Sequence, residues 1–151
     1  MIFKEFTHQH FEEYCAWFED KDLSRWLGPK PDKDWLTYVL ADKTGKQYGI
    51  FQEGKMIAVL GIALPTEESP CLVITDIAVH PKLRGKGIGK AVIHHLLQLY
   101  PQASFKTFVD EKNINAISFF EHLEWKKMEV IDEDGMWVFF MRRRINHPKS
   151  M

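Results

Sequence analysis

The most constraining feature of the sequence is the stretch Cys71–Gln98, which reads CLVITDIAVHPKLRGKGIGKAVIHHLLQ. A β-branched apolar run ends at His80-Pro81, a basic turn with three glycines follows, and an amphipathic helix pattern begins directly after it. Glycines allow the backbone of such a turn to approach a ligand and to adopt positive φ angles. The free N–H groups and the dipole of the helix start favour an anion. The stretch therefore predicts a strand, a phosphate-binding turn over 84–89, and a helix.

Two common phosphate-binding loops do not fit this turn. The pattern Gly-x-x-x-x-Gly-Lys-Ser/Thr fails because Arg84 stands at its first glycine position and Ala91 replaces the hydroxyl residue. The dinucleotide pattern Gly-x-Gly-x-x-Gly fails in both registers, because Lys90 or Val92 stands at the third glycine position. The turn therefore belongs to neither of these nucleotide-binding classes.

The pattern that fits is Arg-x-x-Gly-x-Gly, formed by Arg84, Gly87 and Gly89. Together with the preceding strand and His80-Pro81, it resembles the acyl-CoA-binding signature of the GNAT acetyltransferase superfamily. The resemblance implies acetyl-CoA as the cofactor, with its pyrophosphate held by backbone N–H groups of the turn. The basic side chains of the turn add charge-assisted donors.

A second similarity to the family lies in residues 109–125, VDEKNINAISFFEHLEW. This segment keeps Asn113 and Ala116 of the family pattern Asn-x-x-Ala-x-x-x-Tyr, but Phe120 stands where tyrosine is usual. Phe119 is equally compatible with plain core packing. The cofactor-binding residues that the resemblance implies are Ile77, Ala78, Val79, Arg84, Gly85, Lys86, Gly87, Ile88, Gly89, Lys90, Asn113, Ala116, Phe119 and Phe120.

The order of elements along the chain is also similar to the GNAT fold. The resemblance implies an α/β fold with one mixed sheet of about seven strands and about four helices, whose fourth and fifth strands splay apart to admit the pantetheine arm. We expect one domain over residues 1–145 and a tail over 146–151. Periodicity and turn residues predict strands at 2–6, 48–52, 56–64, 71–79, 105–109, 125–131 and 136–142, and helices at 8–20, 34–41, 87–100 and 113–123.

Composition excludes several classes of partner. The formal net charge of the 151 residues is −1, which argues against general nucleic-acid binding. Cys15 and Cys71 lie in unrelated apolar contexts and do not suggest a disulfide framework. No apolar run approaches the ~18 residues of a membrane helix, and the N-terminus does not resemble a signal peptide. We therefore expect a cytoplasmic monomer or homodimer with no membrane partner, and no spacing resembles a metal site.

Acyl transfer from a thioester to an amine requires a group that removes a proton, because an ammonium of pKa ~10 has no free electron pair. Asp76 is the candidate base, since a carboxylate in an apolar strand has a raised pKa unless it is paired. A solvated or hydrogen-bonded Asp76, with water removing the proton, is the alternative. The resemblance implies backbone N–H donors for the oxyanion at Ala78 and Val79. Four residues alternate onto one face of this strand: Leu72, Ile74, Asp76 and Ala78.

Phe120 also bears on the function, because the family's usual tyrosine serves as a general acid, which contributes roughly 10²–10⁴-fold. The leading hypothesis is an acetyl-CoA-dependent N-acetyltransferase acting on a primary amine of a small molecule or a protein N-terminus. The alternative is a catalytically weak acyl-CoA-binding or sensing module. A third hypothesis is a phosphate-binding structural module unrelated to coenzyme A.

The acceptor site is predicted in the segment 17–35, where three tryptophans alternate with aspartates. Aromatic walls with carboxylates suit a cationic amine through cation–π contacts and ion pairs. Trp26 and Trp35 are the candidate substrate residues. The alternative is that these tryptophans pack in the core and the aspartates cap helices or face water.

Overall fold

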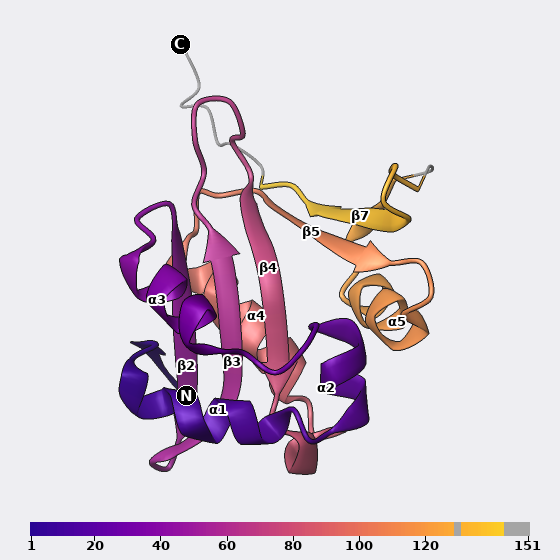
Figure 1. Cartoon of the computed structure of the whole chain (residues 1–151). Coiled ribbons are helices and arrows are strands. Elements are labelled where there is room, and N and C mark those ends of the chain that lie inside the picture. The colour runs from indigo at the N-terminus through magenta and orange to yellow at the C-terminus, as the bar shows by residue number, and fades with distance from the viewer. Residues whose placement is uncertain (129–130, 144–151) are drawn as a thin grey trace.

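The computed structural model describes residues 1–128 and 131–143, which form one sheet with helices against both faces (Figure 1). In this part of the chain the strands follow the spatial order β1-β2-β3-β4-β5-β7-β6. β4 and β5 run parallel, and the other neighbouring pairs are antiparallel. The strands are β1 (Ile2–Glu5), β2 (Gly45–Gln52), β3 (Lys55–Ala63), β4 (Leu72–Val79), β5 (Phe105–Asp110), β6 (Lys126–Lys127) and β7 (Met136–Met141). The α-helices are α1 (Phe11–Trp17), α2 (Lys21–Trp26), α3 (Lys33–Ala41), α4 (Ile88–Leu99) and α5 (Ile114–His122), with 3₁₀ turns η1 (His8–His10) and η2 (Pro81–Leu83).

Local sequence signals account for several element boundaries. The Thr7 hydroxyl caps the first helical turn by accepting a hydrogen bond from Gln9 N at 3.3 Å. Glu53 and Gly54 both have positive φ angles, 52° and 77°, as a two-residue hairpin turn between β2 and β3 requires. These boundaries agree with the predicted elements to within a few residues.

The helical prediction for the first forty residues needs correction. The helix predicted over 8–20 is divided into η1 and α1, and a separate helix, α2, follows it. The described chain therefore has five α-helices instead of the four predicted. The six residues of α2 are too few to show a periodic pattern, and the helix begins because the Asp20 carboxylate caps Leu23 N at 3.1 Å.

The C-terminal prediction is only partly covered by the structure. The strand predicted over 125–131 is the short β6, and β7 matches the strand predicted over 136–142. Residues 129–130 and the tail over 146–151 lie outside the described residues.

Apolar side chains fill both faces of the sheet. On one face α4 and α5 cover a core that includes Leu72, Ile74 and Phe120. On the other face α1 and α2 cover a second core that includes Tyr14 and Ala78. Residues of β4 therefore contribute to both cores.

The predicted splay of the central strands is confirmed. β4 pairs with β5 only from Leu72 to Ile74, opposite Phe105 to Thr107. At the point of separation the Thr107 hydroxyl donates a hydrogen bond to Ile74 O at 3.0 Å. Beyond that point the two strands diverge (Figure 1). The sheet is therefore open on one side of the second half of β4.

A β-bulge in β4 contradicts the prediction that four alternating residues, from Leu72 to Ala78, share one face of this strand. Ile62 of β3 pairs with Ile74, but the next residue, Gly61, pairs with Asp76, so Thr75 is an extra residue. The insertion reverses the alternation beyond it. Leu72 and Ile74 accordingly pack toward α4, whereas Asp76 and Ala78 face α1. The prediction that these four residues share a face is wrong because period two holds only in an unbroken ladder.

Candidate active site

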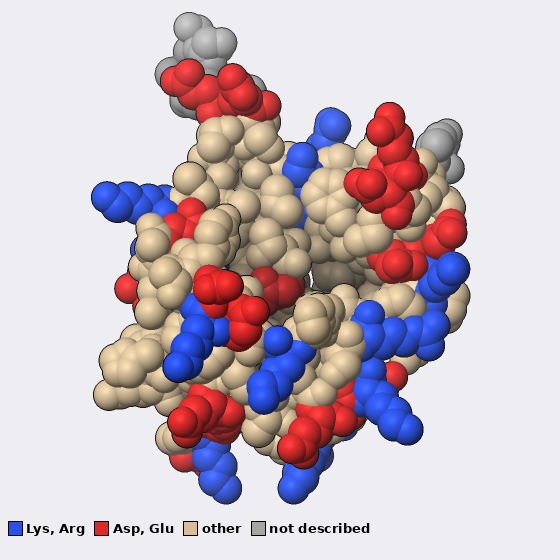
Figure 2. All heavy atoms as spheres, viewed as in Figure 1, with Lys and Arg blue, Asp and Glu red and all other residues tan. Residues whose placement is uncertain are grey.

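A cleft of about 520 Å³ opens where β4 and β5 separate, and α2 and α5 form its other walls. Figure 2 shows the surface hollowed at this place. The structure brings most of the predicted site residues to the cleft, namely Trp26, Asp76, Ile77, Val79, Arg84, Gly89, Asn113, Ala116, Phe119 and Phe120.

The backbone of β4 offers hydrogen-bonding groups to the cleft. His80 N donates to Ile57 O of β3 at 2.9 Å, which makes these two residues a hydrogen-bonded pair of the antiparallel ladder. Such pairs alternate, so the N–H of Ala78 also points to β3, whereas the N–H and C=O groups of Ile77 and Val79 point away from it. Val79 therefore has the orientation predicted for an oxyanion donor. Ala78 does not, because its N–H belongs to the β3–β4 ladder.

The glycine-rich turn leaves the start of α4 open. Gly85 and Gly87 have φ angles of 75° and 78°, and no atom from beyond the neighbouring residues of the chain lies within 4 Å of the position that a Cβ would take on either residue. Gly87 is the N-cap of α4 and provides no side-chain cap. The N–H groups of the first turn, which begins at Ile88, thus have no side-chain partner from their cap residue. The Lys86 and Lys90 side chains are exposed beside this turn.

Gly89 and the α5 residues serve packing as well as the cleft. A Cβ on Gly89 would lie 3.1 Å from Phe119 Cε1, so a glycine here allows α4 to approach α5. The Asn113 side chain caps α5 by accepting a hydrogen bond from Ala116 N at 3.2 Å. Phe120 is 3% exposed and packs against Trp125. Among the described cleft residues none is a tyrosine.

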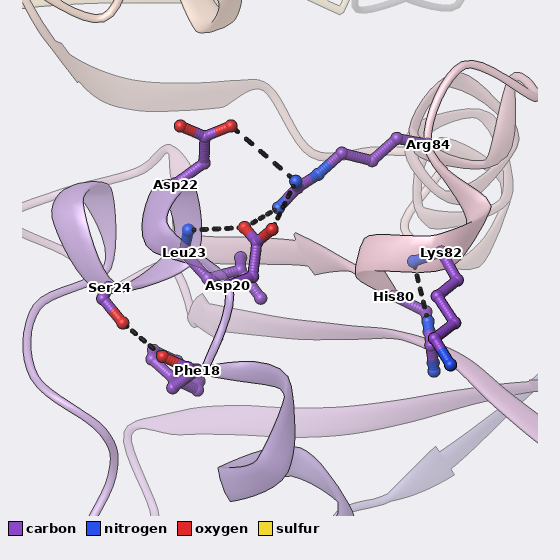
Figure 3. A network of polar contacts seen from close by, with 8 residues as sticks. All are labelled: Phe18, Asp20, Asp22, Leu23, Ser24, His80, Lys82 and Arg84. Carbon is purple, nitrogen blue, oxygen red and sulfur yellow. Dashed lines mark hydrogen bonds and ion pairs between the residues drawn. The ribbon is translucent and has the colours of Figure 1, made fainter.

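Arg84 is held by two carboxylates from the start of α2 (Figure 3). Its guanidinium nitrogens donate to both oxygens of Asp20, at 3.0 and 2.5 Å, and one of them lies 3.7 Å from Asp22 Oδ2. The hydrogen bond from Arg84 holds the pKa of Asp20 below its usual range. The predicted phosphate-binding turn is therefore tied to the helix that lines the opposite wall of the cleft.

Asp76 is a partly buried carboxylate at the open edge of the sheet. Burial raises its pKa, and hydrogen bonds from Gln47 Nε2 and Thr75 Oγ1, each 2.9 Å long, oppose that rise by stabilising the charged form. The nearby Tyr14 hydroxyl has a pKa raised by burial and by the negative charge of Asp76, so it stays protonated. A carboxylate of raised pKa facing a cleft suits proton removal.

The two candidate substrate tryptophans have different environments. Trp26 lines the cleft, with the Arg25 guanidinium 4.5 Å from its ring centre. Trp35 does not line the cleft, because it packs against Phe6, Phe11 and Tyr14 beneath α1. Trp35 is thus partly buried against the core that α1 covers and does not reach the cleft.

Sequence reasoning missed several polar residues of the cleft. Arg25 comes from the unpredicted helix α2, so no signal for it was present in the periodicity, whereas Asp22 of the same helix is one of the aspartates of the predicted acceptor segment 17–35. Thr107 and Asp110 lie on β5, and Asn115 lies on α5 two residues after the family-like Asn113. Alternation along β5 next to a splayed partner could have indicated Thr107.

In the described ranges 1–128 and 131–143, no three His, Cys, Asp or Glu side chains gather closely enough to hold a metal ion. No helix in these ranges has the length and apolar character needed to cross a bilayer.

Comparison with known proteins agrees with this geometry. The family model described as "Acetyltransferase (GNAT) family" matches residues 3–125. The uncharacterized N-acetyltransferase ycf52 of Pyropia yezoensis is 36% identical over 67 residues, which cover 44% of this chain and only 36% of that relative. The corresponding protein of Porphyra purpurea is 35% identical over 67 residues, with the same coverage.

Solved structures share the fold over most of the chain. The aminoglycoside acetyltransferase AAC(6')-Ib in complex with coenzyme A has a TM-score of 0.77 at 19% identity and covers 94% of both chains. An acetyltransferase from Thermus thermophilus has a TM-score of 0.79 at 13% identity, covering 93% of this chain and 97% of its own.

Proposed function

This chain belongs to the GNAT acetyltransferase family, and from that premise we propose that it transfers an acetyl group from acetyl-CoA to a primary amine of a small molecule. The observation that carries the proposal is the gap between β4 and β5 beside the uncapped start of α4. Acetyl-CoA is the cofactor that the family uses, and structural neighbours of this chain are complexes with coenzyme A.

The residues of the cleft fit this cofactor. The open turn at Gly85 and Gly87 leaves backbone N–H groups for a diphosphate, and added side chains at either glycine would occupy that space. The backbone groups of Ile77 and Val79 that face the gap suit the amides of a pantetheine arm, which pair as a strand would. The exposed Lys86 and Lys90 add positive charge at the turn.

The chemistry then follows from the residues of the chain. When bound, acetyl-CoA would supply a thioester carbonyl as the electrophile; as the C–N bond of the amide forms, the thioester C–S bond would break and coenzyme A would leave as a thiolate, a fair leaving group because a thiol has a pKa of ~8.5. Asp76 accepts a proton from the ammonium form of the acceptor, which frees the electron pair of the amine. The N–H of Val79 donates to the negative charge that develops on the carbonyl oxygen. Trp26 provides an aromatic wall for a cationic acceptor.

A small-molecule acceptor is favoured by structural neighbours and by charge. Neighbours of the same fold were solved with the aminoglycosides kanamycin and paromomycin. The cleft of this chain presents Asp22, Asp76 and Asp110, of which Asp76 lies at the open edge of β4. Carboxylates at this position attract a protonated amine.

The proposal is tested by measuring free thiol release from acetyl-CoA with a panel of amines, including aminoglycosides, diamines and peptides with a free N-terminus. The diamines and aminoglycosides should cause faster release of coenzyme A than any peptide. In Asp76→Asn, kcat should fall by about 10²-fold or more, while coenzyme A still binds. Background thiol release with every amine would contradict the proposal, and release with peptides alone would move the acceptor to protein N-termini.

A further inference from the structure

Three residues on neighbouring strands, the last of them Asp76, lie opposite one another in a row across the sheet. Gln47 of β2 lies opposite Gly61 of β3, and Gly61 lies opposite Asp76 of β4. The two outer residues are separated by a whole strand, yet Gln47 Nε2 donates a hydrogen bond to Asp76 Oδ2 at 2.9 Å. The Gln47 side chain therefore reaches across the middle strand.

Gly61 makes this reach possible. A Cβ on Gly61 would overlap Asp76 Oδ1 and would lie 2.6 Å from Thr75 Oγ1 and 2.7 Å from Gln47 Oε1. All three polar side chains thus occupy the space above a residue without a side chain. Gly61 has no positive φ, so its glycine is explained by this close approach and not by backbone conformation.

The bulge at Thr75 completes the arrangement. It turns Asp76 to the face where Gln47 can meet it, and it brings the Thr75 hydroxyl within 2.9 Å of Asp76 Oδ1. Each carboxylate oxygen then accepts one hydrogen bond, which fixes the rotation of the group. The main chain of Gln47 is anchored as well, because its C=O accepts a hydrogen bond from Phe6 N at 2.8 Å.

We propose that Gln47 is a positioning residue that reaches through the slot above Gly61 to hold the Asp76 carboxylate at the edge of the cleft, with Thr75 as the second donor. The role of Asp76 as the base rests on the proposed function. The positioning itself rests on the cross-strand geometry, so the two can be tested separately.

The effect of removing a hydrogen-bond donor on the pKa of Asp76 depends on the other groups around this carboxylate. α1 contributes Tyr14, which stays protonated, and the cleft walls contribute Asp22, Arg25, Arg84 and Asp110. None of these donates a hydrogen bond to Asp76, whereas Gln47 and Thr75 both do. Removing either donor therefore destabilises the charged carboxylate and raises the pKa of Asp76 above its wild-type value.

The decisive measurement is the titration of the Asp76 side-chain carboxyl by carbon NMR in the protein without ligand, with the signal assigned by its loss in Asp76→Asn. Gln47→Leu and Thr75→Val should each move the midpoint to higher pH, and Thr75→Ser should restore the wild-type value. Gln52→Leu, at the exposed end of the same strand, is the matched control and should leave the midpoint unchanged. Gln47→Glu keeps the shape of the side chain but replaces the donor with a carboxylate, so it should give the largest upward shift.

The same variants are then assayed for amine acetylation as a function of pH. The acid limb of kcat/KM should move upward with the NMR midpoint, so that the rate at the acid end falls by up to about tenfold in Gln47→Leu. An unchanged NMR midpoint in folded Gln47→Leu would overturn the positioning role, whatever happens to the rate. A shifted NMR midpoint with an unshifted acid limb would support the positioning and refute Asp76 as the base.

Discussion

Replacing Asp20 with Asn should remove an ion pair between α2 and the glycine-rich turn proposed to bind phosphate while keeping the cap of α2. Both oxygens of Asp20 accept hydrogen bonds from Arg84, and one of them also caps Leu23 N. Asparagine is as good an N-cap as aspartate, so Asp20→Asn isolates the charge. Asp20→Ala removes the charge and the cap together.

The size of the effect follows from exposure and geometry. The Arg84 and Asp20 side chains are 39% and 24% exposed, so solvent screens the pair, and exposed ion pairs are worth about 0.2–1 kcal/mol. The two-pronged hydrogen bonding places this pair near the upper end of that range. We expect Asp20→Asn to lower the free energy of unfolding by about 1 kcal/mol, or about 3 °C in Tm. Asp20→Ala should cost about 2 kcal/mol because it also loses the cap.

The difference in unfolding free energy between wild type and Asp20→Asn should depend on pH, because the ion pair requires a charged Asp20. The pKa of Asp20 is lower in the folded protein than the unfolded value of ~3.9, because Arg84 stabilises its charged form. The contribution of the pair is therefore complete above about pH 4 and is lost as the pH falls through the folded-state pKa. Urea unfolding of wild type and Asp20→Asn from pH 7 downward should show the two free energies converging in acid. Equal losses for Asn and Ala, or a gap that does not change with pH, would refute the assignment to the ion pair.

Two further predictions concern the cofactor and acceptor walls. Gly87→Asp should weaken coenzyme A binding by more than about tenfold, because it adds a negative charge beside the diphosphate. Gly87→Asn is equally strained at a φ of 78° but adds no charge, so it should weaken coenzyme A binding far less. If calorimetry shows equal losses of coenzyme A affinity in the two variants, the charge is not the cause. Trp26→Ala should raise the KM of the amine by about threefold or more with little loss of stability, since Trp26 lines the cleft. Trp35→Ala should cost about 2 kcal/mol of stability and leave that KM unchanged, because Trp35 packs under α1. A raised KM in Trp35→Ala, together with a loss of stability and an unchanged KM in Trp26→Ala, would contradict the placement of Trp26 in the cleft and of Trp35 against the core.

Much of the fold was predictable because its signals are short-range. The strand, glycine turn and helix over 72–99 follow from adjacent residue types, and Thr7 and Asn113 act as caps on their own neighbours. The short helix α2 escaped prediction because six residues give no periodic pattern. The bulge at Thr75 escaped because nothing in the sequence of β4 distinguishes an extra residue from an alternating one.

The features of the candidate site also fall into those set by neighbouring residues in the chain and those set by tertiary contacts. The sequence alone determined that a glycine-rich helix start follows an apolar strand and that a carboxylate lies in that strand, since both depend on residues adjacent in the chain. The tertiary structure alone decided that Arg84 meets Asp20 across 64 residues, that Trp26 but not Trp35 reaches the cleft, and that Gln47 meets Asp76 above Gly61. The first two contacts depend on where α2 packs against the sheet, and the third depends on strand order and register, since a shift of one residue in register turns every later side chain to the opposite face.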